Sequence, residues 1–228
     1  MNDDLKFPLP ESDPPDASLM AKISNQLAQS LPAVRPLPSN AVLLAISLGA
    51  FAVVSFALAA AVGFKAFASL SAAEMAAYYT TVAVFAVLFA RAVIERMIPG
   101  EKHFIPPSIL SVAAFVVLGV LMALLFSNYD TTRFVATGIP CIRLGVVSAL
   151  ISGLLGWRLF RKGYFVQPRE TILLYGLFAG FLGIAVLALH CPVRNSLHFI
   201  VWHLGAMLLA GLAGLFLGRF LENRANAD

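Results

Sequence analysis

Six runs of apolar residues, each of 18 residues or more, make up most of the chain: 41–64, 75–93, 108–126, 143–160, 171–189 and 199–217. An α-helix rises about 1.5 Å per residue, so roughly 20 residues cross the hydrocarbon core of a bilayer. The runs are apolar on every face, whereas membrane strands alternate in polarity over about ten residues. The pattern predicts an all-α integral membrane protein with six transmembrane helices.

The composition fits this fold class. Hydrophobic residues make up 60% of the 228 residues and charged residues 12%, and the mean hydropathy is +0.85. An ordinary soluble domain is roughly 45–50% apolar and about 25% charged. The net charge of +4 comes from Lys and Arg residues that stand mostly at the ends of the apolar runs. They indicate membrane topology rather than direct binding of nucleic acid.

Lys and Arg residues are divided unequally between alternate connections of the runs. With a cytoplasmic N-terminus, four lie outside the cell membrane, namely Lys65, Arg133, Arg143 and Arg194, and the other twelve lie inside. Cytoplasmic connections carry an excess of positive residues. We therefore expect both termini in the cytoplasm, residues 41–220 as the membrane domain and 221–228 as a short cytoplasmic tail. Cys141 and Cys191 would then lie at the outer, oxidising face.

The first 40 residues differ from the rest, because they are rich in proline and acidic residues and read as a cytoplasmic tail. Within them, residues 18–31 predict an amphipathic helix whose apolar arc contains Leu19, Met20, Ile23, Leu27 and Leu31. Such a helix can lie on the inner leaflet or fill a groove in a protein partner. Its single basic residue, Lys22, favours the protein partner, because leaflet-binding helices usually carry many.

The glycines of the last three runs are spaced like those of closely packed membrane helices. The fourth run contains Gly145, Gly153 and Gly156, the fifth contains Gly176, Gly180 and Gly183, and the sixth contains Gly211 and Gly214 and is followed by Gly218. Small residues let helix backbones approach each other in a bilayer. We expect the last three runs to form a close-packed unit.

Catalytic groups are scarce along the chain. The interiors of the runs contain no Asp, Glu or Lys, although proton and ion pathways usually need such groups. The sequence also shows no paired carboxylates and no HExxH motif. We therefore expect no enzymatic activity, and no required cofactor.

Thiols and imidazoles gather at the expected outer face. Cys141 precedes the fourth run, and Cys191 follows the fifth, near His190, His198 and His203. This set suits thiophilic ions such as Zn(II), Cu(I) or Cd(II), and it equally suits a reversible disulfide. Cys141 and Cys191 are thus candidate metal ligands for a transient heavy-metal ion, with the three histidines as auxiliary ligands.

Two arginines stand close to the cysteines in sequence. Arg143 is two residues from Cys141 and Arg194 is three from Cys191, and a nearby positive charge favours the thiolate. Other interpretations remain open. The two cysteines can be small buried hydrophobic residues, the histidines can serve only as hydrogen-bonding groups, or two of the histidines can bind haem.

Several short motifs occur in an order that resembles a known family. They are LPAVRPLP at 31–38, a PC pair at 140–141, LHCP at 189–192 and FIVWHLG at 199–205. Together with the six runs they resemble the NrsF-type membrane-bound anti-sigma factors, the negative regulators of sigma F. The resemblance implies a protein of the bacterial inner membrane whose N-terminal segment sequesters an extracytoplasmic-function sigma factor. It also implies that Cys141 and Cys191 are the periplasmic thiols that respond to heavy-metal or oxidative stress.

Two functional hypotheses follow. The first is a signalling protein with an outer thiol switch and an inner segment that sequesters a sigma factor. The alternative is a small membrane redox or metal-ion transport protein that uses the same cysteines. Removal of residues 1–38 separates them, because only the signalling function needs the tail.

Overall fold

The protein is described by a computed structural model that covers residues 17–30, 38–66, 70–98, 100, 103–126, 128–160 and 167–225. Nearly all of these residues are helical, and none is in a strand. The chain separates into two compact units, Met1–Pro38 and Ser39–Asp228. The two units are described in turn.

The first unit contains one described helix, α1, over Ala17–Ser30. The side chains of Leu19, Met20, Ile23 and Leu27 on this helix are exposed. Leu31, the fifth member of the predicted apolar arc, lies outside the described residues.

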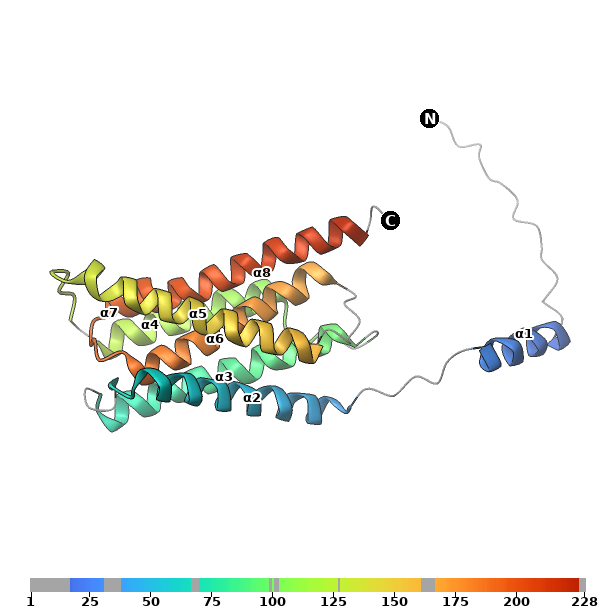
Figure 1. Cartoon of the computed structure of the whole chain (residues 1–228), viewed down its shortest axis with the longest axis horizontal. Coiled ribbons are helices and arrows are strands. Elements are labelled where there is room, and N and C mark those ends of the chain that lie inside the picture. The colour runs from blue at the N-terminus through green and yellow to red at the C-terminus, as the bar shows by residue number, and fades with distance from the viewer. Residues whose placement is uncertain are drawn as a thin grey trace, which may run out of the picture. The chain divides into compact units, whose positions relative to one another are not determined.

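The second unit is a bundle in which six helices of the described chain are long and apolar enough to span a membrane. Five are α2 (Asn40–Val62), α3 (Ala72–Met97), α4 (Pro107–Leu125), α5 (Phe134–Phe160) and α6 (Pro168–His190). The sixth is continuous through α7 (Ser196–His198), the π-helix η2 (Phe199–His203) and α8 (Leu204–Ala225). The predicted fold class is confirmed. Figure 1 shows that α2 begins and α8 ends at one end of the bundle, and that α7 lies at the other.

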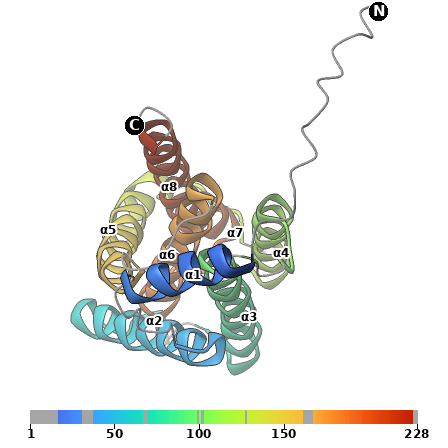
Figure 2. The same cartoon turned by 90° about the vertical axis from the view of Figure 1, so that its right-hand side faces the viewer.

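Helix α6 is the centre of the bundle. Seen end-on in Figure 2, it lies between α2, α3, α5 and α8. Of an apolar stretch of 18 residues in this helix, 83% is buried. It packs most extensively against α8 and next against α5. A β-carbon placed on Gly176 would lie 2.5 Å from the carbonyl oxygen of Ala210, and one on Gly183 would lie 2.5 Å from that of Gly145. Only glycine permits these approaches, as the spacing of the small residues predicts.

Helix α5 begins earlier than predicted. The expected start at residue 143 is wrong, because the helix already begins at Phe134 and contains Pro140. Proline cannot donate the backbone hydrogen bond of a helix interior, and helices are therefore often interrupted at a proline. In this bundle the turn before Pro140 is helical as well. Cys141 consequently lies within the helix, not in the connection before it.

Helix α3 extends beyond the predicted apolar run and carries buried charges near its last turn. Arg96 is only 2% exposed, and its guanidinium donates to the carbonyl oxygen of Ile105 at 3.2 Å and to a carboxylate oxygen of Glu170 at 3.4 Å. Glu95 accepts hydrogen bonds from Arg91 at 2.6 Å and from the backbone of Phe104 at 3.0 Å. Buried charges persist where they are paired and hydrogen-bonded, and here they link α3 to α6.

Candidate thiol and histidine site

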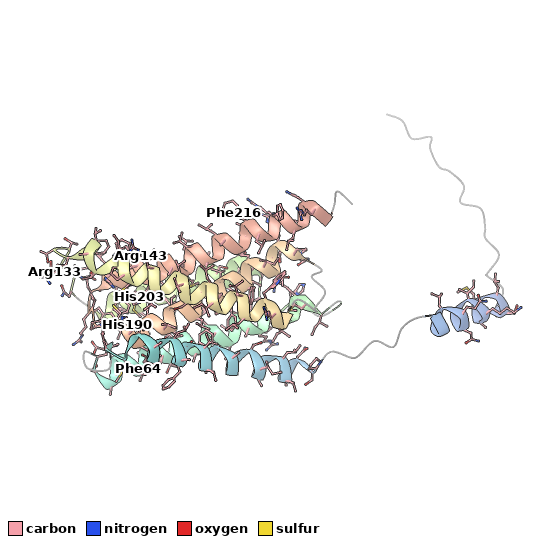
Figure 3. The ribbon with its side chains drawn as sticks, in the orientation of Figure 1. Phe64, Arg133, Arg143, His190, His203 and Phe216 are labelled. Carbon is pink, nitrogen blue, oxygen red and sulfur yellow. The ribbon has the colours of Figure 1, made fainter. Side chains whose placement is uncertain are left out.

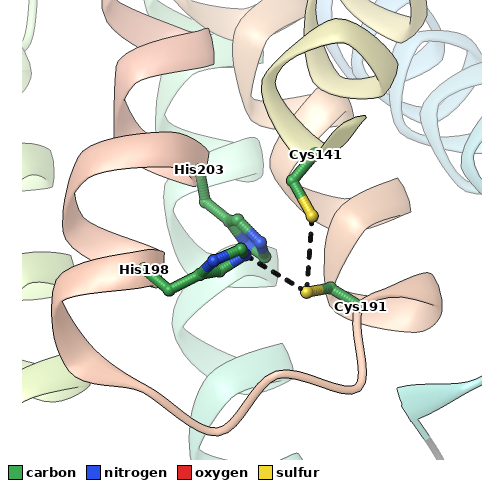
Figure 4. Close-up of side chains that lie close together, drawn as sticks. All are labelled: Cys141, Cys191, His198 and His203. Atoms are coloured by element: carbon green, nitrogen blue, oxygen red, sulfur yellow. Dashed lines mark hydrogen bonds between the residues drawn. The ribbon is translucent and has the colours of Figure 1, made fainter. Parts of the chain in front are cut away.

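Two cysteines from separate elements meet at one end of the bundle. The Sγ atoms of Cys141 on α5 and Cys191, directly after α6, lie 3.5 Å apart, and both residues are buried and free of a disulfide. Figure 4 shows the two sulfur atoms facing each other, with His198 and His203 beside them. The thiols rest on a hydrophobic cluster that includes Leu187. Residues 50 positions apart thus form one site.

His198 continues a chain of hydrogen bonds that starts at the thiols. Its Nε2 lies 3.4 Å from Cys191 Sγ, and its Nδ1 lies 3.4 Å from the hydroxyl of Thr137. Because that hydroxyl donates to the carbonyl oxygen of Arg133 at 2.9 Å, it accepts from Nδ1–H. This assigns the proton of His198 to Nδ1 and leaves Nε2 as an acceptor toward Cys191.

His203 completes the group. It is 1% exposed, lies 5.4 Å from His198 between ring centroids, and neither of its ring nitrogens has a hydrogen-bond partner among the described residues. Four ligand atoms, one each from Cys141, Cys191, His198 and His203, lie within 4.8 Å of one another. The arrangement brings together two thiols and two imidazoles in a buried environment.

The connection between α6 and α7 is fixed to neighbouring elements by hydrogen bonds. The side chain of Asn195 accepts from the backbone N–H of His198 at 2.9 Å, and donates to the carbonyl oxygen of Asp130 at 2.7 Å. The backbone N–H of Ser196 donates to the carbonyl oxygen of Asn128 at 3.1 Å. Asparagine at this position is a strong N-cap. The cap and these bonds set the position of His198 against the thiols.

A comparison with known families places this geometry in context. Residues 27–222 match the family described as NrsF, negative regulator of sigma F. The chain belongs to the NrsF family. No curated protein and no solved structure matches it. The resemblance drawn from the short motifs is confirmed, and the family description makes this protein a negative regulator whose partner is a sigma factor.

Among the predicted auxiliary ligands of this NrsF chain, the structure brings His198 and His203 to the thiols but not His190. The Nδ1 atom of His190 lies 2.9 Å from the carbonyl oxygen of Gly63, just after α2. His190 ends α6, and this contact directs its ring toward the end of α2. Figure 3 shows it in the same half of the bundle as His203, Arg133 and Arg143, with Phe216 farther along α8.

The two arginines that were predicted to favour the thiolates lie at the surface. Arg143 is exposed on α5, and Arg194 is exposed and forms an ion pair with Glu74 at the start of α3. The hydrogen bond to Cys141 and burial both raise the pKa of Cys191. This thiol therefore holds its proton at neutral pH, because its immediate neighbours are another thiol, the acceptor Nε2 of His198 and apolar side chains rather than a cation.

Two residues that position this NrsF site were not identified from the sequence. Thr137 lies one helical turn before Cys141 on α5 and contacts His198, but a single threonine in the connection predicted before the fourth apolar run gives no signal of that role. Asn195 offered a signal, since Asn three residues before His198 fits an N-cap. That signal predicts a helix start and does not identify what the helix start positions.

Proposed function

We propose that this NrsF chain holds a sigma factor of the extracytoplasmic-function class at the bacterial inner membrane through its N-terminal segment. Release of the sigma factor follows when Cys141 and Cys191 react with a thiophilic metal ion or an oxidant at the outer face. The observation that carries the proposal is the buried pair of free thiols with Sγ atoms 3.5 Å apart. This proximity lets two cysteines that are 50 positions apart react as one unit.

The oxidative route is a thiol–disulfide exchange. Cys141 and Cys191 each give up a proton, the pair gives two electrons to a small disulfide, and that disulfide leaves as two thiols while the Sγ–Sγ bond forms. The two sulfur atoms of a disulfide are about 2.05 Å apart. The observed Sγ–Sγ distance of 3.5 Å must therefore shorten by about 1.5 Å. Because Cys141 belongs to α5 and Cys191 follows α6, this bond ties the two helices together.

Helix α6 is suited to carry that change across the bundle. It is the most buried of the six spans, and its first turn holds Glu170, which accepts a hydrogen bond from Arg96 of α3. Leu182 and Val186 of α6 form a buried cluster with Ala59 of α2, and α2 is the helix that follows the tail. A switch needs two arrangements that the input distinguishes. A shift of α6 changes its contacts with both α2 and α3.

The proposed contact with the sigma factor is the apolar face of α1, where Leu19, Met20 and Ile23 are exposed. Burial of one such side chain in a groove contributes about 1.5–3 kcal/mol. Ile23→Asp in the full chain should therefore weaken capture of the sigma factor at least about tenfold. The matched control is Asn25→Asp, which adds the same charge at an exposed position that lies about 200° around the helix from Ile23, at about 100° per residue.

The measurement is retention of the purified sigma factor by the immobilised full chain in detergent. Loss with Ile23→Asp and retention with Asn25→Asp supports the assignment. Equal retention by both variants would show that α1 is not the contact. Deletion of residues 1–38 also distinguishes the alternative function, because a transport or redox activity of the membrane domain would survive that deletion.

A further inference from the structure

We infer that Cys141, Cys191, His198 and His203 form one four-coordinate site for a divalent cation of the zinc class, Zn²⁺ or Cd²⁺. The inference deepens the proposed function, since it assigns a ligand set to the sensing end of the bundle. It adds two histidines, and a reason for their positions, to the two thiols. The four side chains come from α5, the connection after α6, α7 and η2.

The distances within the group are close to those of a tetrahedral site. Zinc binds cysteine sulfur at about 2.3 Å and histidine nitrogen at about 2.0–2.1 Å, which separates ligand atoms by about 3.3–3.8 Å in a regular tetrahedron. The Sγ atoms are 3.5 Å apart, and Cys191 Sγ is 3.4 Å from His198 Nε2. All four ligand atoms lie within 4.8 Å of one another. The widest pair must close by no more than about 1.5 Å.

The π-helix η2 explains why two histidines five positions apart face the same ion. In an α-helix, residues five apart point in directions about 140° apart, because each residue turns about 100°. In η2 the backbone N–H of Leu204 instead bonds to the carbonyl oxygen of Phe199, five residues earlier. This wider turn directs His203 toward His198, with ring centroids 5.4 Å apart. Single π-turns of this kind are frequent at functional sites.

The state of His203 points to a ligand. Its two ring nitrogens are buried with no hydrogen-bond partner among the described residues, although the side chain is only 1% exposed. An unsatisfied buried polar group costs about 1–3 kcal/mol. Coordination of one ring nitrogen of His203 to a cation would satisfy that nitrogen. Cys141 and His203 would then bind the ion as Cys191 and His198 do.

His198 is already oriented as a metal ligand. Histidines that bind metals usually donate their other ring N–H to an oxygen, which fixes the tautomer. Thr137 accepts that hydrogen bond from Nδ1, and Asn195 fixes the backbone of His198. Nε2 therefore faces the thiols with its lone pair, and these two residues are positioning residues for the site.

Charge selects a divalent cation. When the ion binds, both thiols lose their protons to solvent and become thiolates, so two negative charges cancel the charge of a divalent cation. A monovalent ion would leave a net negative charge in a buried site, which is unfavourable in an apolar environment. A polar pocket of about 160 Å³ opens toward His198 and is lined by side chains that include Asn128, Asp130, Thr132 and Arg194. It offers a route for the ion and for the released protons.

The first test uses the unaltered full chain in detergent, reduced and then loaded with Zn²⁺. X-ray absorption at the zinc edge should show one ion per chain, with two sulfur and two nitrogen neighbours at about 2.3 and 2.0–2.1 Å. Binding of less than one ion per chain, or neighbours without sulfur or without nitrogen, would overturn the inference. This readout depends on no substitution and so on no variant that fails to fold.

The second test compares histidine variants by titration with Co²⁺, whose visible spectrum reports tetrahedral coordination by thiolate. His198→Ala and His203→Ala should each weaken binding at least tenfold, and His190→Ala, at the same end of the bundle, should leave it unchanged. Equal binding by all three variants would overturn the four-ligand site. The titration contains no sigma factor. If the chain does not bind the ion, the four-ligand site is wrong, but oxidation of the two thiols can still be the signal that releases the sigma factor. Failure of the proposed function would instead appear as no release under either input.

Discussion

The close contact between α5 and α6 determines the distance between the thiols, and Gly183→Ala tests it. A β-carbon at residue 183 would lie 2.5 Å from the carbonyl oxygen of Gly145, whereas ordinary contacts begin at 3.4 Å. The two helices must therefore separate by about 0.9 Å, because the atom in the way is backbone and cannot rotate aside. Gly145 is one turn from Cys141, so the separation extends to the thiol pair.

The matched control is Gly153→Ala on α5, where an added β-carbon meets nothing within 4 Å. Both substitutions gain helix propensity of about 1 kcal/mol, so their difference isolates the clash. Overpacking costs about 1–3 kcal/mol, and we expect Gly183→Ala to be less stable than Gly153→Ala by that amount.

Unfolding of each variant in mixed detergent, followed by tryptophan fluorescence, gives the free energies. The rate at which a small disulfide oxidises the Cys141–Cys191 pair gives the second readout, and it should fall in Gly183→Ala only. Equal stability and equal oxidation rates in the two variants would refute the argument that this glycine contact positions the thiols.

Two further predictions concern topology and the charged end of the bundle. Tyr129→Cys and Phe104→Cys are each introduced into a variant in which both native cysteines are serine. After the outer membrane is permeabilised, a maleimide that cannot cross the inner membrane should label Tyr129→Cys and not Phe104→Cys. The reverse pattern would show that the bundle has the opposite orientation. Arg96→Met should lower the free energy of unfolding by about 1–3 kcal/mol, because it leaves the carbonyl oxygen of Ile105 without its donor. Arg158→Met, at an exposed position in the last turn of α5, should cost less than about 1 kcal/mol, and equal losses in the two variants would contradict the role given to Arg96.

The six spans could be predicted from sequence because a bilayer imposes a length and an apolar composition on each helix. The start of α5 could not. Pro140 resembles a helix boundary, and only the packing of the bundle shows that the preceding turn, from Phe134, is helical. The burial of Glu95 and Arg96, which lie just past an apolar run, could not be predicted either. Their partners Phe104 and Glu170 belong to other segments of the chain.

The chemistry of the site was predictable in kind, but its membership was not. His190, His198 and His203 were equally eligible as ligands from the sequence, because all three stand near Cys191 at the expected outer face. The structure separates them through tertiary contacts, because His190 lies against Gly63 whereas the π-turn directs His203 toward His198. A π-turn is a change of hydrogen-bond partner and leaves no periodic signal in the sequence.

The most direct test of the account is release of the sigma factor from the full chain reconstituted in vesicles, with Cd²⁺ or a small disulfide added on the side of the thiols. We predict that the unaltered chain releases its sigma factor. Cys141→Ser, Cys191→Ser and the double variant should all retain it to the same extent, because residues that act as one unit are not additive. Release from the double variant equal to that from the unaltered chain would contradict the assignment of the Cys141–Cys191 pair as the sensor.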